Sequence, residues 1–241
     1  MAHEKLAKNH LPAAARAEIL RWTAGLGAVT ADALAIRWQT SVDSARARLC
    51  AAERHGLLVR HRPLIDRPSL YTITRSGLRA IGARGLDPAR VSAAGAVHLI
   101  ECARVAAALE LRYPDHRVAG ERELRRDERE RGRSIASAEL GADGRARTSR
   151  HRPDLVLWPG DSHSCSPVAI EVELTVKAPE RLLAICRAWA RARCVVGVVY
   201  LVAPDVERAL LNAVQRAHAE QRIAIVPLQA LPRERPVPSG A

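Results

Sequence analysis

Phenylalanine is absent from this chain of 241 residues, and all aromatic residues together make up only 3% of it. The apolar core must therefore be built from Ala, Leu, Val and Ile, for which the 48% hydrophobic content is ample. No apolar run approaches the ~20 residues that a membrane span needs, and residues 1–10 lack the apolar segment of a signal peptide. These absences predict a globular protein of the cytoplasm that does not bind membranes.

The five cysteines are odd in number and include no Cys-x-x-Cys pair, which is typical of reduced thiols. His163 and Cys165 offer two metal ligands, but no nearby residue completes a tetrahedral zinc site. The sequence therefore does not favour structural zinc.

Lysine is also scarce, since only Lys5, Lys8 and Lys177 among the 38 basic side chains are lysines. Arginine stays charged and binds through a rigid fork, whereas the lysine ammonium is a compact charge whose pKa shifts in a buried site. Lys177 closes an acidic segment that begins at Ile170. A lysine at this position indicates chemistry that guanidinium does not perform.

Positive charge is in excess, with a net charge of +12, and it is unevenly distributed. Residues 1–90 carry 15 basic and 7 acidic side chains, while residues 91–241 carry 23 and 19. Nucleic acid is the commonest partner of a soluble basic protein. The first third of the chain is therefore the predicted docking surface for double-stranded DNA.

Residues 12–82 predict a helix-turn-helix followed by a two-stranded wing. Thr30 and Ser41 are good N-caps for the second and third helices, and Gly56 ends the third. The predicted elements are helices over residues 12–25, 31–38 and 41–55, strands over 57–62 and 70–73, and a helix that restarts at Thr74. This order resembles the winged-helix module of many bacterial regulators.

The outward face of the third helix has the chemistry to enter a major groove. The predicted base contacts are Ser44, Arg46 and Arg48, and the predicted phosphate contacts are Arg60, Arg62, Arg67 and Arg75. The alternatives are a helical domain whose arginines only face solvent, or a winged helix that binds protein.

Residues 92–228 predict a second domain, a mixed sheet flanked by helices, so that the chain as a whole is α/β (α+β overall). The predicted helices cover residues 93–113, 179–193 and 205–221, and the predicted strands cover 117–124, 154–158, 168–176, 194–202 and 222–227. Residues 125–150 fit this core poorly and are interpreted as a mobile excursion or hairpin. Residues 229–241 are predicted to be a disordered tail.

Carboxylates on two of these strands predict a metal site. If residues 168–176 form a strand, Glu171, Glu173 and Lys177 project from one face, and the two like charges repel. A divalent cation relieves that repulsion, and Asp154 on an adjacent strand completes the set. Mg²⁺ prefers oxygen ligands, activates bound water and polarises phosphate, while the lysine stabilises the developing charge.

The same residues carry a resemblance. Pro153-Asp154 followed by Glu171-Val-Glu173 is similar to the active-site signature of the PD-(D/E)XK nuclease superfamily, although Glu173 replaces the usual lysine. The chain also resembles the replication-relaxation family of plasmid and actinobacterial proteins over most of its length. The stretches that carry this second resemblance are residues 120–125, His151-Arg-Pro-Asp154-Leu and Ile170-Glu-Val-Glu-Leu-Thr.

The resemblance implies a winged helix joined to a restriction-endonuclease-like α/β core, with a role in plasmid replication and DNA relaxation. Asp154, Glu171, Glu173, Lys177 and Glu121 are the candidate catalytic residues. Asp154, Glu171 and Glu121 are the candidate ligands of Mg²⁺ or Mn²⁺, with Glu121 placed on the first core strand.

Two functions remain open at this point. One is a Mg²⁺-dependent endodeoxyribonuclease that cleaves or nicks DNA during replication of a plasmid or mobile element. The other is a non-catalytic DNA-binding regulator of replication or transcription with a degenerate core. A second copy of the chain and replication or mobilisation proteins are further candidate partners. The simpler interpretation of the acidic strand is an edge strand with one polar face.

Overall fold

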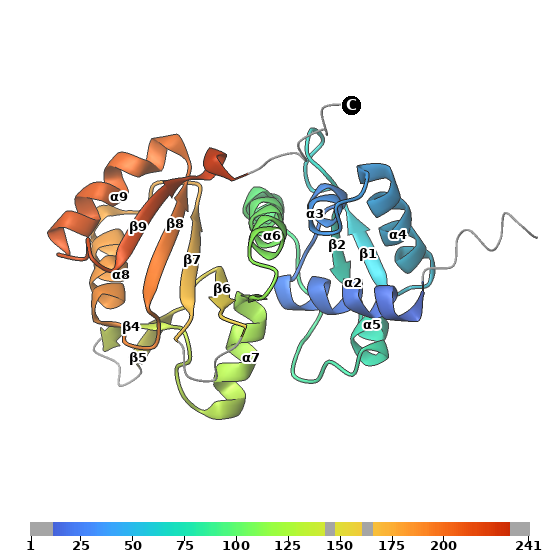
Figure 1. Cartoon of the computed structure of the whole chain (residues 1–241), viewed down its shortest axis with the longest axis horizontal. Coiled ribbons are helices and arrows are strands. Elements are labelled where there is room, and N and C mark those ends of the chain that lie inside the picture. The colour runs from blue at the N-terminus through green and yellow to red at the C-terminus, as the bar shows by residue number, and fades with distance from the viewer. Residues whose placement is uncertain (1–11, 143–147, 161–165, 232–241) are drawn as a thin grey trace, which may run out of the picture. The chain divides into compact units, whose positions relative to one another are not determined.

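The computed structural model describes residues 12–142, 148–160 and 166–231 (Figure 1). The contacts divide the chain into two compact units, Met1–Ala107 and Ala108–Ala241. The division falls inside the long helix α6 (Ala93–Arg112) rather than before it, because the first part of this helix packs on the first unit. His163 and Cys165, the two residues that were considered and not favoured as zinc ligands, lie outside the described residues, as does the tail from residue 232.

Unit 1 contains the helices and the hairpin that the sequence predicts. Thr30 and Ser41 each accept a hydrogen bond from the backbone N–H three residues on, as N-caps do. Thr74 caps the last short helix in the same way. The elements are α2 (Ala13–Leu26), α3 (Ala31–Arg37), α4 (Val42–Arg54), β1 (Leu58–His61), β2 (Leu70–Ile73) and α5 (Arg75–Ala80).

The core of unit 1 joins these elements around aliphatic side chains. Ile19 of α2, Leu34 of α3, Leu49 of α4 and Ile73 of β2 are all at most 1% exposed. Ala103 of α6 packs against the same cluster. α3 and α4 are therefore held at a fixed angle, with β1 and β2 as an antiparallel pair beside them.

Unit 2 is built on a five-stranded mixed sheet with the order β3-β6-β7-β8-β9. β3 pairs with β6 and β6 with β7 in the antiparallel sense, whereas β7, β8 and β9 are parallel. The strands are β3 (Arg117–Gly120), β6 (Leu155–Trp158), β7 (Val168–Glu173), β8 (Gly197–Val202) and β9 (Ile223–Pro227). The predicted mixed α/β architecture is confirmed.

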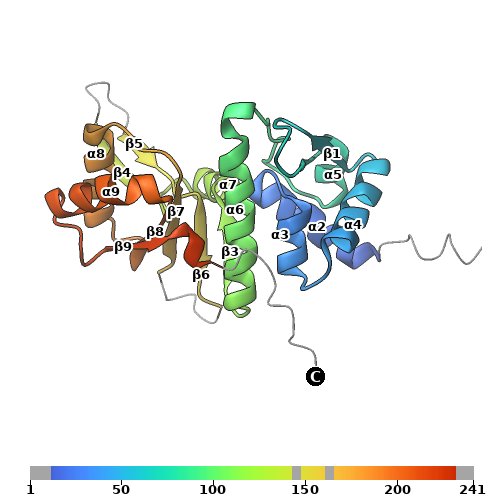
Figure 2. The ribbon, with the colours of Figure 1, turned by 90° about the horizontal axis from the view of Figure 1, so that it is seen from above.

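Helices α8 (Pro179–Arg191) and α9 (Pro204–Arg216) connect the parallel strands and lie side by side (Figures 1 and 2). Both crossovers progress in the same direction along the sheet, so right-handed connections place both helices on one face. Trp189 of α8, Tyr200 of β8 and Leu210 of α9 are at most 1% exposed at this contact. The core of unit 2 therefore lies between α8, α9 and the sheet.

The prediction of one strand over residues 117–124 was wrong. β3 ends at Gly120, and α7 (Glu121–Arg131) begins at the next residue. The alternation of Glu121-Arg-Glu123-Leu fits a strand, but two acids in a first turn also stabilise a helix through its dipole. Glu121 pairs with Arg125 one turn later, which adds to the helix.

The segment 125–150 is partly the predicted hairpin. After α7, strands β4 (Ala138–Ala142) and β5 (Thr148–His151) pair in the antiparallel sense, and β4 packs against α8. The predicted disordered tail also begins too early, because Leu228–Ala230 forms the short 3-10 helix η1.

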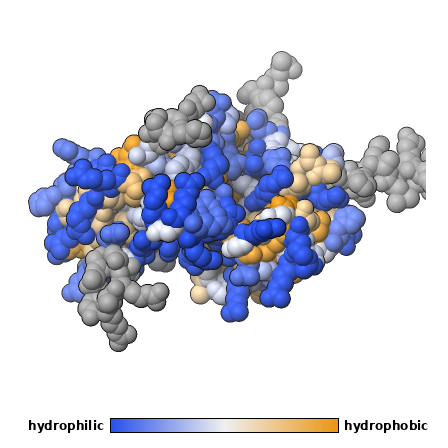
Figure 3. All heavy atoms as spheres, turned by 90° about the horizontal axis from the view of Figure 1, so that it is seen from below, coloured by the Kyte–Doolittle hydropathy of each residue, from blue (hydrophilic) through white to orange (hydrophobic). Residues whose placement is uncertain are grey.

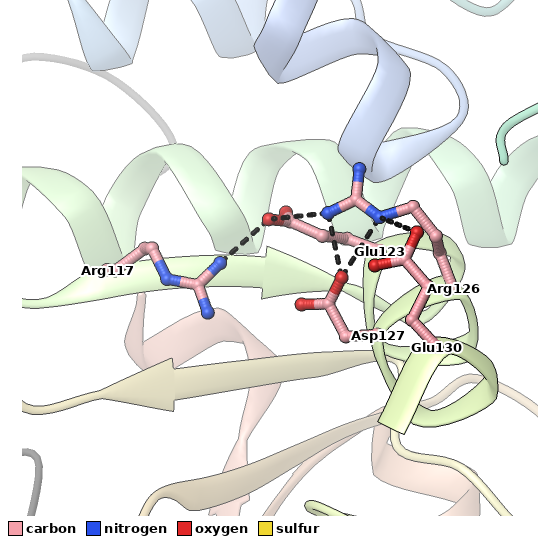
Figure 4. A network of polar contacts seen from close by, with 5 residues as sticks. All are labelled: Arg117, Glu123, Arg126, Asp127 and Glu130. Carbon is pink, nitrogen blue, oxygen red and sulfur yellow. Dashed lines mark hydrogen bonds and ion pairs between the residues drawn. The ribbon is translucent and has the colours of Figure 1, made fainter. Parts of the chain in front are cut away.

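An ion network fixes α7 against β3 (Figure 4). The guanidinium of Arg126 lies 2.7 Å from Asp127 and within 4 Å of Glu123 and Glu130, and Arg117 of β3 lies 2.7 Å from Glu123. Networks of this kind hold geometry better than isolated surface pairs. The junction of β3 and α7 is therefore well defined, and this junction contacts Asp154.

Hydrophilic side chains cover most of the face that is shown in Figure 3. Among the described helices, none combines the length and the apolarity that a membrane crossing requires.

Candidate functional site

Asp154 is held at the start of β6 by hydrogen bonds on two sides. Its Oδ2 accepts from the backbone N–H of Val172 over 2.8 Å, and its carbonyl accepts from the backbone N–H of Glu121 over 3.0 Å. Val172 lies between the two glutamates of β7. The side chain of Asp154 is therefore directed at the acidic end of the neighbouring strand.

Glu171 is nearly inaccessible, with only 4% of its surface exposed. Its Oε1 accepts a hydrogen bond from the indole Nε1 of Trp189 over 3.1 Å and lies 2.7 Å from Nε2 of His151. Burial raises the pKa of Glu171, while His151 and Lys177 counteract this and the charge of Asp154 adds to it. A buried carboxylate with this environment is typical of functional sites.

Glu173 is also buried, at 5% exposure, and its Oε2 pairs with Nζ of Lys177. β7 ends at Glu173, so Lys177 reaches back from the loop beyond the strand instead of continuing it as predicted. Burial lowers the pKa of Lys177, and the charges of Glu171 and Asp154 raise it. These mutual effects show that Asp154, Glu171 and Lys177 lie within electrostatic range of one another.

The structure therefore brings together four of the five predicted catalytic residues: Asp154, Glu171, Glu173 and Lys177. Glu121 does not join them, because it lies on α7, where its side chain is 40% exposed and its carboxylate pairs with Arg125. In the described part of the chain, the predicted ligand set Asp154, Glu171 and Glu121 does not place three oxygens within 4.8 Å of one another.

The composition of the cluster nevertheless suits a divalent cation. Three carboxylates face one lysine and one imidazole, which leaves excess negative charge in a buried place. Mg²⁺ and Mn²⁺ favour oxygen donors of this kind. By the same measure, Asp154, Glu171 and Glu173 do not place three oxygens within 4.8 Å of one another either. These carboxylates would therefore have to move closer together to hold an ion, which would supply a polarised phosphate and an activated water.

His151 and Trp189 were not predicted as site residues. His151 ends β5 and stands three positions before Asp154. Its ring also lies edge-on to Trp189, with 5.8 Å between the ring centroids. The proximity of His151 to Asp154 in the sequence was the available signal, whereas nothing in the sequence pairs Trp189 with Glu171.

A second feature lies in unit 1, where α3, α4 and the hairpin β1–β2 line a cavity of about 740 Å³. The predicted DNA contacts that line it are Arg46, Arg60, Arg62 and Arg67. Asp32 is the single acidic residue of its lining. The cavity is therefore a basic groove between α4 and the hairpin β1–β2, and it is called the arginine groove below.

Three predicted DNA contacts do not line the arginine groove. The guanidinium of Arg48 lies 4.9 Å from the ring centroid of Trp38. This cation–π contact already engages the Arg48 side chain within the fold. The backbone N–H of Ser44 donates to Ser41 in the N-cap, and its side chain is half-buried. Arg75 lines a different pocket of about 460 Å³, together with Arg79 and Arg84.

Comparison of the chain with protein-family models, curated proteins and solved structures found no match.

Proposed function

We propose that this protein binds double-stranded DNA through unit 1. The order α3, turn, α4 and hairpin supports the assignment of a winged helix-turn-helix, in which the second helix of the motif enters the major groove and the hairpin, as the wing, contacts the flanking backbone. The excess of positive charge in residues 1–90 supports a polyanionic partner.

The arginine groove is the observation that carries this proposal. Four guanidinium groups from α4 and the wing converge on one cavity, although these elements are separated in the sequence. Arg62 and Arg67 form no ion pair with the residues that the structure describes, so their charge is available to a ligand. Arg46 pairs with Asp43 on the surface, where exchange for a phosphate or a guanine edge costs little.

Salt titration tests DNA binding. The full chain is mixed with a fluorescently labelled mixed-sequence duplex, and anisotropy is measured at increasing salt. Contact of three or four arginines with phosphates predicts a logarithmic slope of about −3 to −4. Absence of binding at low salt, or binding that does not respond to salt, would refute the proposal.

Metal-assisted cleavage of DNA is the second candidate function, and the convergence of Asp154, Glu171, Glu173 and Lys177 favours it. An aspartate that precedes one strand and a Glu-x-Glu on the next match the order that the PD-(D/E)XK resemblance implies. In this assignment the carboxylates hold Mg²⁺ or Mn²⁺, and Lys177 stabilises the charge that develops on the phosphate. The replication-relaxation resemblance connects such an activity with plasmid replication.

Incubation with supercoiled plasmid and Mg²⁺ or Mn²⁺ separates the two functions. Nicking or linearisation that is lost in both Asp154→Ala and Glu171→Ala would support the nuclease. A mobility shift of the plasmid without cleavage would instead support a non-catalytic regulator whose buried carboxylates only stabilise the fold.

A further inference from the structure

The turn at the tip of the wing exposes an aliphatic side chain completely. Ile65 has a relative exposure of 101%, the largest of the exposed apolar residues that the structure describes. A single exposed apolar residue is common on protein surfaces. The position of Ile65 is unusual because it also lines the arginine groove, between Arg62 and Arg67.

The neighbouring residues hold Ile65 outward. Leu64 is partly buried and packs on a small cluster that contains Ala28, Leu70 and Ala96, so the wing is anchored one residue before the tip. Pro63 and Pro68 restrict the backbone on both sides. Because Ile65 buries no area in the protein and its loop is restrained, its apolar surface is available to a ligand at a low entropic cost.

We infer that Ile65 inserts into the minor groove of the bound duplex and unstacks a base step. Proteins that bind the minor groove often insert an aliphatic wedge between base pairs and bend the DNA, with basic residues on the flanking phosphates. Here Arg62 and Arg67 flank the wedge. Pyrimidine–purine steps are the easiest to unstack, so the bound sites carry such a step opposite the wing.

The charge at the tip limits which residues can enter the groove. Asp66 follows Ile65 in the turn, and the negative potential of the minor groove repels a carboxylate. Asp66 must therefore stay outside the groove while Ile65 enters it. In this proposal Arg62 and Arg67, which flank this residue pair in the sequence, offset the charge of Asp66 and contact the two backbones.

This inference rests on the proposed DNA binding, and one experiment tests both. The full-length protein selects duplexes of about 30 base pairs from a random-sequence pool, a length over which bending is measurable. A selected duplex then carries a fluorophore at each end to report bending, and 2-aminopurine at successive steps to report unstacking. The variants are Ile65→Ala, Ile65→Leu and, as a matched control, Val59→Ala.

The control removes an exposed aliphatic side chain from the same wing. Val59 lies on β1 at 42% exposure and does not line the arginine groove. We expect the wild type and Val59→Ala to bend the duplex and to raise 2-aminopurine fluorescence at one step. Ile65→Ala should lose both signals and bind about tenfold more weakly, because the burial of one aliphatic side chain is lost. Ile65→Leu should keep both signals.

The outcomes distinguish a failure of the Ile65 wedge from a failure of DNA binding. If the wild-type protein retains no duplex from the pool at low salt, DNA binding itself is refuted. If it retains duplexes without enriching any sequence, the wedge is refuted while DNA binding stands. If it enriches duplexes and Ile65→Ala bends and unstacks them as the wild type does, the wedge is refuted while DNA binding stands. Misfolding does not confuse this result, since Ile65 contributes no buried area to the fold.

Discussion

Nε2 of His151 lies 2.7 Å from Oε1 of Glu171, and the two residues are 20 positions apart in the sequence. This contact joins the end of the hairpin β4–β5 to the centre of the sheet. It also gives a buried carboxylate a partner that can carry a positive charge. The acidic cluster is therefore part of the core of unit 2 and not a solvated edge strand.

Replacement of Glu171 by Gln should change stability in a pH-dependent way. Burial raises the pKa of Glu171, so the folded state binds this proton more tightly than the unfolded state does. The contribution of Glu171 to the unfolding free energy is therefore fully present below the ordinary glutamate pKa. It is lost as the pH rises through the pKa that Glu171 has in the folded state. Glutamine does not ionise, so a glutamine at position 171 loses no stability as the pH rises, and it can still accept hydrogen bonds from Trp189 and His151.

Urea unfolding of the two proteins from mildly acidic to mildly alkaline pH, in a chelator, measures this difference. Glu171→Gln should match the wild type in acid and exceed it at neutral and alkaline pH. A variant that matches the wild type in acid but is less stable at neutral and alkaline pH would show that the ionised carboxylate stabilises the fold.

The metal ligands can be distinguished by substitution. Asp154→Asn should abolish any metal-dependent nicking, because Asp154 is directed at β7 and lies within range of Glu171. Glu121→Gln should keep it, since the Glu121 carboxylate pairs with Arg125 on the surface of α7. Nicking of supercoiled plasmid by both purified variants is the measurement. Equal loss in both variants would restore Glu121 to the ligand set.

Gly77 should tolerate no side chain. A Cβ on this residue of α5 would lie 2.3 Å from the carbonyl oxygen of Leu57 and 2.7 Å from Cγ1 of Ile73. Gly77→Ala should therefore cost about 1–3 kcal/mol of unfolding free energy. Gly95→Ala is the control, because its Cβ meets only Ser92 Oγ at 3.4 Å and helical alanine should gain about 0.5–1 kcal/mol. Equal unfolding midpoints of the two variants would contradict this packing.

Local signals in the sequence predicted most of unit 1. The caps Thr30, Ser41 and Thr74 act within three residues, so the helix starts were readable without tertiary information. The start of α7 was not readable, because the alternating acids at 121 and 123 fit a strand and a helix turn equally well. The outcome depends on Gly120 ending β3 opposite Leu155, which is a tertiary contact.

Part of the site was also predictable from local signals in the sequence. Glu171 and Glu173 are buried on one strand beside Asp154, and Lys177 pairs with a residue four positions away. Contacts between distant segments were not predictable. Trp189 and His151 reach Glu171 from α8 and β5, and no periodicity in the sequence specifies which buried side chain meets a given carboxylate.

Comparison of two double arginine variants tests whether the arginine groove binds DNA. Arg62→Ala with Arg67→Ala removes two charges from the groove, and Arg75→Ala with Arg79→Ala removes two from the other pocket of unit 1. Both doubles change the net charge equally, so a general electrostatic effect would be the same in each.

Duplex affinity measured by anisotropy across a salt series separates the two doubles. The variant with Arg62→Ala and Arg67→Ala should lose at least tenfold in affinity, and its logarithmic salt slope should become less negative by about 2, while the control variant stays close to the wild type. Equal losses of affinity in both variants, or a larger loss in the control, would contradict DNA binding by the arginine groove.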